Sequence, residues 1–221
     1  PFSSILRGFI LPKFFLENCG AYLAAIRSIG RTEEYFYMPV FESAAMIPPQ
    51  TRREALTEVR AQLDTVSGSI LNIRVGGNDL SHAFGLRRPA NRTIYDLRPV
   101  ADILIDIVAA FGTQYVVSGP VWEYYSGEGW EEGLRREMEL DLLNGFTGKT
   151  VIHPNQIPVV NEMLRVSQQD YADARAILNW DTGSGSLVSA SEDGGRMNEY
   201  NTHSRWARRI VLRAERYGVR A

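Results

Sequence analysis

Two acidic residues follow consecutive apolar runs of this sequence. Glu42 comes directly after Met38-Pro39-Val40-Phe41, and Asp79 comes after Val75 with Gly76-Gly77-Asn78 between them. A polar group just after the last apolar residue of a parallel strand lies at the C-terminal edge of the sheet, where barrel active sites form. One β/α unit separates the two acids along the chain, so neighbouring strands are expected to bring them side by side.

Two carboxylates at one buried edge repel each other unless they share a proton or a cation lies between them. Hard oxygen ligands in low number, with room for water and substrate, suit Mg²⁺, and Mn²⁺ is the alternative ion. The residues alone also allow a second interpretation, in which Glu42 caps a helix and Asp79 makes a loop turn. The spacing does not choose between the two.

The elements that would position these acids are visible as an alternation of patterns. Short apolar runs, bounded by Gly, Pro or Asn and rich in β-branched or aromatic residues, are typical of buried parallel strands. They predict strands over 8–12, 35–41, 69–75, 114–117 and 149–152. Segments of helical period lie between and after them and predict helices over 51–66, 99–111, 131–144, 157–164, 169–179 and 202–217.

The helix predicted over 51–66 has the clearest pattern. Thr51 and Glu54 have the spacing of a capping box at its start. An apolar stripe follows at Leu56, Val59, Leu63 and Val66. Near the end of the helix predicted over 131–144, Gly145 stands where a left-handed C-cap is wanted.

The repeated β-then-α order implies a parallel sheet with right-handed crossovers, either open and doubly wound or closed into a barrel. No GxGxxG follows a strand and no P-loop is present. Gly76-Gly77-Asn78-Asp79 lacks the later glycine and the helix of a dinucleotide-binding turn. The pattern therefore favours a (β/α)8 barrel over residues 1–165, with a C-terminal helical extension over 166–221.

The C-terminal extension has its own composition. Asp181–Ser186 has the Gly and Ser content of a flexible loop. The last helix carries an apolar stripe of Trp206, Ile210 and Ala214, and a run of arginines at positions 205, 208, 209, 213 and 216. We interpret the arginines as a solvated face and the extension as an arm that packs on a neighbouring subunit.

Bulk properties exclude several classes of function. The chain has 221 residues and a net charge of −2, with 24 basic and 26 acidic residues interspersed, so it lacks the basic stripe of a nucleic-acid binder. Its single cysteine, Cys19, cannot make an internal disulfide. Without a signal peptide or an 18-residue apolar run, no membrane association is expected and the cytoplasm is the default location. Because the first residue is Pro1 and not Met, we expect that an upstream part of the natural protein is absent.

Several strings occur together in an order that resembles the citrate lyase beta-subunit family, within the HpcH/HpaI aldolase superfamily. They are Leu11-Pro12-Lys13, Met38–Ala44, Gly76–Leu80, Gly148-Lys149-Thr150-Val151-Ile152-His153-Pro154-Asn155-Gln156-Ile157 and Asp193–Met197. The resemblance implies a barrel, Mg²⁺ on Glu42 and Asp79, and retro-aldol cleavage of a hydroxy-acyl-CoA or a related hydroxy acid. It also implies a homo-oligomer, with a trimer favoured.

The same resemblance predicts substrate contacts. Lys13, at a strand end, is expected to contact substrate or a carboxylate. Backbone N–H groups of Gly77, Asn78 and Leu80 are expected to hold a substrate carboxylate, since glycines permit a close approach. His153 has two interpretations: a hydrogen-bond partner or acid in the site, or a tie between a strand end and a neighbouring loop.

The sequence also departs from the family pattern. If Leu11-Pro12-Lys13 belongs to the fourth strand, the first three strands and the family's substrate-binding arginine are missing from this chain. Ser118 stands where relatives usually have an aspartate, and the aromatic insert Trp122–Tyr125 follows it. The insert and the string Phe41-Glu42-Ser43 resemble a divergent subgroup of C–C bond lyases, and the departures together leave the use of CoA open. A pyruvate-type aldolase acting on free hydroxy-oxo acids, and a non-catalytic barrel that keeps the metal site, are the alternatives.

Overall fold

The structure is a computed structural model that describes residues 5–29, 35–181, 183 and 187–220. The chain forms two compact units, Pro1–Ile157 and Pro158–Ala221. The division into a barrel over 1–165 and an arm over 166–221 stays a prediction about domains. Among the described residues, none of the helices combines the length and the apolar composition needed to cross a bilayer.

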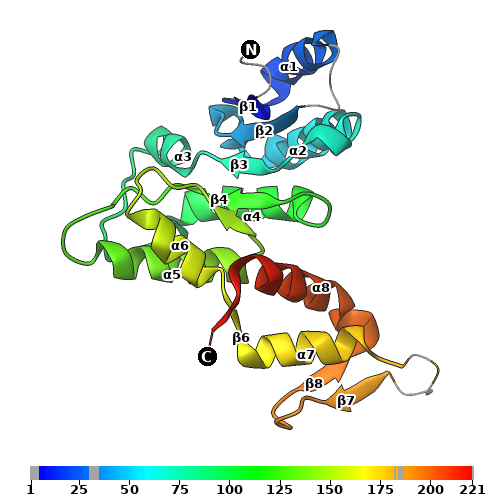
Figure 1. The fold of residues 1–221 in the computed structure, drawn as a ribbon. Coiled ribbons are helices and arrows are strands. Elements are labelled where there is room, and N and C mark those ends of the chain that lie inside the picture. Colours follow the sequence, from blue (N-terminus) through cyan, green and yellow to red (C-terminus); the bar gives the residue numbers. More distant parts are fainter. Residues whose placement is uncertain (1–4, 30–34, 182, 184–186, 221) are drawn as a thin grey trace. The chain divides into compact units, whose positions relative to one another are not determined.

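The first unit contains one parallel sheet whose five strands lie in chain order (Figure 1). The strands are β1 (Gly8–Leu11), β2 (Phe36–Phe41), β3 (Ile73–Val75), β4 (Val117–Gly119) and β5 (Gly148–Lys149). A doubly wound sheet reverses its strand order at a switch point, whereas a barrel adds each new strand beside the last. The observed order is therefore that of a barrel wall.

Helices connect these strands. They are α1 (Leu16–Ser28), α2 (Pro49–Asp64), α3 (Gly77–Ala83), α4 (Arg98–Phe111) and α5 (Trp130–Leu143), with 3-10 turns η2 (Ala44–Met46), η3 (Ser67–Ser69) and η4 (Ile94–Asp96). Helix α6 (Gln156–Met163) crosses the boundary between the units. Helices α1 and α3 have no counterpart among the predictions.

The core lies between one face of the sheet and the helices. Tyr37 and Phe41 of β2 and Ile73 of β3 are fully buried there. The predicted stripe of α2 joins them: Leu56, Val59 and Leu63 are buried, and Val66 packs partly buried just past the helix. Because side chains alternate along a strand, Val40, Arg74 and Ser118, which pair in register across β2, β3 and β4, belong to the opposite face.

The boundaries of several elements differ from the predictions. The capping box at Thr51 is wrong: α2 begins at Pro49, whose fixed φ suits the first helical position, so Thr51 lies inside the helix. The third strand is shorter than 69–75, because residues 67–69 form a 3-10 turn. The fifth strand is Gly148–Lys149 instead of 149–152. The predicted C-cap is confirmed, since Gly145 has φ +97°.

The second unit is built from α7 (Gln168–Leu178) and α8 (Tyr200–Tyr217). Strands β7 (Val188–Ala190) and β8 (Met197–Glu199) pair antiparallel, and β6 (Val166–Ser167) pairs parallel with β9 (Val219–Arg220). On α8, Ile210 and Ala214 are buried and Trp206 packs against the same cluster. Arg205, Arg208, Arg209 and Arg216 are exposed, but Arg213 is half-buried, and burial lowers the pKa of its guanidinium. Of the predicted loop, Thr182 and Ser184–Ser186 lie outside the described residues.

Candidate metal and substrate site

Glu42 and Asp79 line one cavity at the C-terminal ends of β2 and β3. Glu42 directly follows β2, and Asp79 lies in the first turn of α3. The prediction that no helix follows Gly76-Gly77 is therefore wrong, and Asp79 does not make a loop turn. The cavity has a volume of about 360 Å³, and its lining also includes Arg74 and Thr150.

Lys13 contacts both acids. Its backbone N–H donates to Glu42 Oε1 at 2.9 Å, and its ammonium Nζ donates to Asp79 Oδ1 at 2.7 Å. The backbone of Lys13 is left-handed, with φ +50°, which is uncommon for a residue with a side chain. The hydrogen bond and the charge of Asp79 raise the pKa of Lys13, and Glu42 adds a smaller effect. One residue thus contacts both carboxylates that the sequence pairs, Asp79 through its charged ammonium and Glu42 through its neutral backbone N–H.

Gly76 provides the space that the Glu42 carboxylate occupies. A Cβ on Gly76 would lie 2.3 Å from Glu42 Oε2 and 2.4 Å from Glu42 Cβ. The φ of Gly76 is −89°, so its backbone is open to any residue and the requirement for glycine is steric. The carboxylate therefore rests against the bare backbone between β3 and α3.

This donor set fits a hard divalent cation. Two carboxylates face one cavity, one of them seated in a backbone cradle, and both already contact a cationic residue. Among the described residues, no cluster of three His, Cys, Asp or Glu side chains could hold a metal. An ion here would therefore take its other ligands from water and substrate, as Mg²⁺ usually does.

We expect Gly76→Ala to weaken Mg²⁺ binding by about 10-fold or more. Loss of a residue that only supports a metal ligand already costs about 10- to 100-fold in affinity, and displacement of the ligand itself should cost at least as much. The added methyl would push the Glu42 carboxylate out of its seat. Isothermal titration calorimetry with MgCl₂ measures the effect. Gly20→Ala is the matched control, since a Cβ there meets nothing within 4 Å. Equal Mg²⁺ affinity in the two variants would show that the space at Gly76 does not position Glu42 for the metal.

The predicted backbone contacts separate into two groups. Gly77 and Asn78 line the cavity, and their role toward a substrate stays a prediction. Leu80 does not fit that role. Its N–H donates to the Gly76 carbonyl at 3.1 Å, and its side chain is fully buried in the core. Leu80 therefore holds α3 in place.

His153 and Ser118 have structural contacts. His153 lies beyond β5, its ring stacks on Tyr125 at 4.4 Å between centroids, and its Nδ1 accepts from the Asn155 N–H. These contacts favour the interpretation of His153 as a tie between loops. The Ser118 hydroxyl is buried and accepts from Asn72 Nδ2 at 2.7 Å, within the sheet.

Arg74 is a cavity residue that the sequence analysis missed. It stands in the middle of β3, half-buried, between the buried Ile73 and Val75. Its Nε and Nη2 each lie 3.4 Å from Thr150 Oγ1. The sequence feature that could have indicated Arg74 is its position as a charged residue between two apolar residues of one strand. Side chains alternate along a strand, so this side chain must point away from the core.

A buried ion cluster beside the site was missed as well. Lys149 Nζ lies 2.7 Å from Glu137 Oε1 and 2.7 Å from Asp141 Oδ2, and all three side chains are inaccessible or nearly so. Arg88 Nε lies 2.9 Å from Glu137 Oε2. Burial raises the pKa of Asp141, and the positive charge of the Lys149 ammonium partly offsets that rise.

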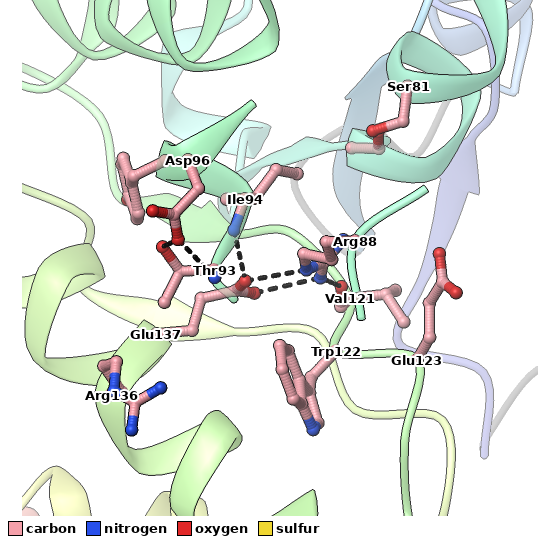
Figure 2. Close-up of polar contacts among 12 residues, drawn as sticks. Ser81, Arg88, Thr93, Ile94, Asp96, Val121, Trp122, Glu123, Arg136 and Glu137 are labelled. Carbon is pink, nitrogen blue, oxygen red and sulfur yellow. Dashed lines mark hydrogen bonds and ion pairs between the residues drawn. The ribbon is translucent and has the colours of Figure 1, made fainter. Parts of the chain in front are cut away.

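The cluster fastens loops that reach the cavity. Figure 2 shows Arg88 directed at both Glu137 and the Val121 carbonyl, and the Ile94 N–H directed at Glu137. Val121 lines the cavity, and so does Thr150, the neighbour of Lys149. The cluster therefore fixes part of the cavity wall without facing the cavity.

Comparisons with known proteins show the family and the fold of this chain. A family model described as C–C bond lyase of the TIM-barrel fold matches residues 2–219. An L-malyl-CoA/beta-methylmalyl-CoA lyase of Cereibacter sphaeroides is 38% identical over 74 residues, which make up 33% of this chain and 22% of that enzyme. The match thus spans only about a fifth of that relative's length.

Two solved structures share the fold. The CitE protein of Mycobacterium tuberculosis, in complex with magnesium, acetoacetate and coenzyme A, has a TM-score of 0.60 at 20% identity and covers 93% of this chain and 77% of that one. A citrate lyase of Burkholderia xenovorans LB400 has a TM-score of 0.68 at 16% identity and covers 97% of this chain and 65% of that one. At these identities the structures show a common fold alone.

Proposed function

Because this chain belongs to the family of C–C bond lyases of the TIM-barrel fold, we propose that it is a Mg²⁺-dependent lyase acting on a small hydroxy acid or its CoA thioester. The family confirms the predicted barrel and the predicted resemblance to citrate lyase beta subunits. The observation that carries the proposal is the pair of carboxylates, Glu42 and Asp79, that share one cavity and one cationic neighbour.

The reaction proposed is a retro-aldol cleavage. A base accepts the hydroxyl proton of the substrate, and its C–O bond becomes a carbonyl as the C–C bond breaks. The electron pair of that bond passes to the other fragment, which forms an enolate and then takes up a proton. Mg²⁺ held by Glu42 and Asp79 would supply Lewis acidity toward the oxygen that becomes the carbonyl. Lys13, whose raised pKa keeps it charged, is proposed to contact an anionic oxygen of the substrate from the rim of the cavity.

The size of the cavity supports a small reacting acid. Its volume of about 360 Å³ lies near the lower end of the roughly 300–1,000 Å³ of small-molecule sites. A small acid would fit inside it, and a CoA group would extend beyond it. A hollow of about 720 Å³ between α2 and α4 is lined by ion pairs such as Arg52 with Asp106. We prefer the smaller cavity because it alone of the two contains the strand-end acids.

A substrate panel tests the proposal on the full chain. L-malyl-CoA, citryl-CoA and free 4-hydroxy-2-oxo acids are each assayed with Mg²⁺, with Mn²⁺ and with EDTA. We expect turnover of at least one substrate, lost in EDTA and restored by excess Mg²⁺. Cleavage confined to the free oxo acids would identify the pyruvate-type aldolase. Turnover that survives EDTA would contradict the metal, and Mg²⁺ binding without any turnover would favour a non-catalytic barrel.

A further inference from the structure

The cavity contains a cation whose acidic partner is absent from the described chain. Arg74 lines the same wall as Glu42 and Asp79. Among the described residues, the hydrogen-bond partner of its side chain is Thr150 Oγ1, which lies 3.4 Å from two of its nitrogens. That distance is at the outer limit of a hydrogen bond, and a guanidinium offers five N–H donors. Most of its N–H donors therefore remain for other partners, and Arg74 lines the cavity in which a ligand would lie.

Among the described residues of the same unit, the buried cations are paired with acids. Arg52 lies 2.7 Å from Asp106, Arg88 lies 2.9 Å from Glu137, and Lys149 lies 2.7 Å from two carboxylates. Within the part of the chain that the structure describes, no carboxylate lies within 4 Å of the Arg74 guanidinium. A half-buried charge is costly unless something compensates it. Because none of the described carboxylates pairs directly with Arg74, a ligand that enters the cavity is the source of a direct acidic partner.

We infer that Arg74, supported by Thr150, forms a subsite for a carboxylate of the substrate, separate from the group held at Glu42 and Asp79. The inference rests on the proposed function for the position of the metal. Planar guanidinium groups bind carboxylates through two parallel hydrogen bonds, which makes this pairing both strong and directional.

The charges of the cavity agree with a ligand that carries two negative charges. Without metal, the two acids are balanced by Lys13 and Arg74. A divalent cation raises the local charge to plus two, and the cavity then favours an acid with one anionic group near the metal and a second near Arg74. The substrate class inferred is therefore a small acid with two anionic ends. If one end is a CoA thioester, the carboxylate that binds Arg74 is the other end and stays free.

Two pairs of 2-oxo acids isolate the second carboxylate. Oxaloacetate is pyruvate with an added carboxylate, and 2-oxoglutarate is 2-oxobutyrate with an added carboxylate. In calorimetric titrations with Mg²⁺ present, we expect the unmodified protein to bind at least one diacid about 10- to 100-fold more tightly than its matched monoacid. In Arg74→Gln that preference should disappear, because the diacid loses affinity and the monoacid does not.

Two variants separate this role from a structural one. Arg74→Lys keeps the charge but not the paired donors, so it should keep part of the preference. Arg53→Gln removes an exposed arginine of α2 outside the cavity and should leave both affinities unchanged. Arg74→Gln should also stay folded and should bind Mg²⁺ at least as tightly as the unmodified protein, because it removes a positive charge from the cavity.

The outcomes distinguish this inference from the proposed function. The subsite would be overturned if the unmodified protein bound diacids and monoacids with equal affinity. It would also be overturned if Arg74→Gln lost affinity equally for both. If the unmodified protein bound no Mg²⁺, the proposed function would fail. A titration without metal would then test the subsite. The subsite requires that the unmodified protein binds the diacid more tightly than the Arg74→Gln variant does.

Discussion

Replacing Asp79 by Asn is expected to abolish measurable Mg²⁺ binding and to lower lyase turnover by about 10³-fold or more, while the chain stays folded. The amide keeps the shape of the side chain but removes the negative charge that a hard cation requires. Loss of Lewis-acid stabilisation worth several kcal/mol corresponds to a rate loss of about this size. Calorimetry with MgCl₂ and a turnover assay in excess Mg²⁺ measure the two effects.

The fold should survive this change. The Asp79 side chain is 47% exposed and its ion-pair partner Lys13 is 65% exposed, and such surface pairs contribute little to stability. Asp102→Asn is the matched control, since it makes the same chemical change on an exposed acid of α4. If Asp79→Asn bound Mg²⁺ as tightly as Asp102→Asn, the assignment of the metal to Asp79 would be wrong.

The local patterns of the sequence were sufficient for the order of the five strands of the parallel sheet and for most of the helices, but not for α1 and α3. The stripe of Leu56, Val59 and Leu63 predicts its buried face because helical period and core contact are both set by spacing. Element boundaries were less predictable. Two mechanisms compete at the start of α2, a capping box at Thr51 and a proline at Pro49, and the fixed φ of the proline prevails.

The site was predictable where a residue follows the end of a strand. Glu42 and Asp79 could be paired because neighbouring parallel strands end at one edge. The contact of Lys13 with both acids was not predictable. It depends on a left-handed backbone conformation that the residue type does not indicate. Arg74 was hidden inside a strand, and its importance follows from the lack of an acidic partner, which only tertiary structure reveals.

The partners in the buried ion cluster were also not predictable from the sequence. Glu137 and Asp141 are one helical turn apart on α5, and beside the buried Leu134 and Met138 they fall on the inner face. That spacing marks two acids that need a cation. The sequence does not say that the cation is Lys149, which belongs to a different element and a motif with several other polar residues.

Lys149→Met is expected to destabilise the chain by about 3–5 kcal/mol, the usual cost of removing one partner from a buried ion pair. Methionine fills a similar volume, so the loss should arise from the two carboxylates left at Glu137 and Asp141 with Arg88 as their remaining cation. Urea unfolding followed by circular dichroism measures the change. Arg98→Met is the control on an exposed pair, where a change within about 0.5 kcal/mol is expected.

The pH dependence of Lys149→Met identifies the cause. Burial raises the pKa of Asp141, and Lys149 opposes that rise, so the pKa of Asp141 should rise further in the variant. A carboxyl with a raised folded-state pKa contributes stability at low pH that is lost as pH rises through that pKa. The deficit should therefore be smaller at pH 5 than at pH 8, and the second change Asp141→Asn should recover part of it. An equal deficit at both pH values, with no recovery in the double variant, would show that lost packing and not unpaired charge destabilises the protein.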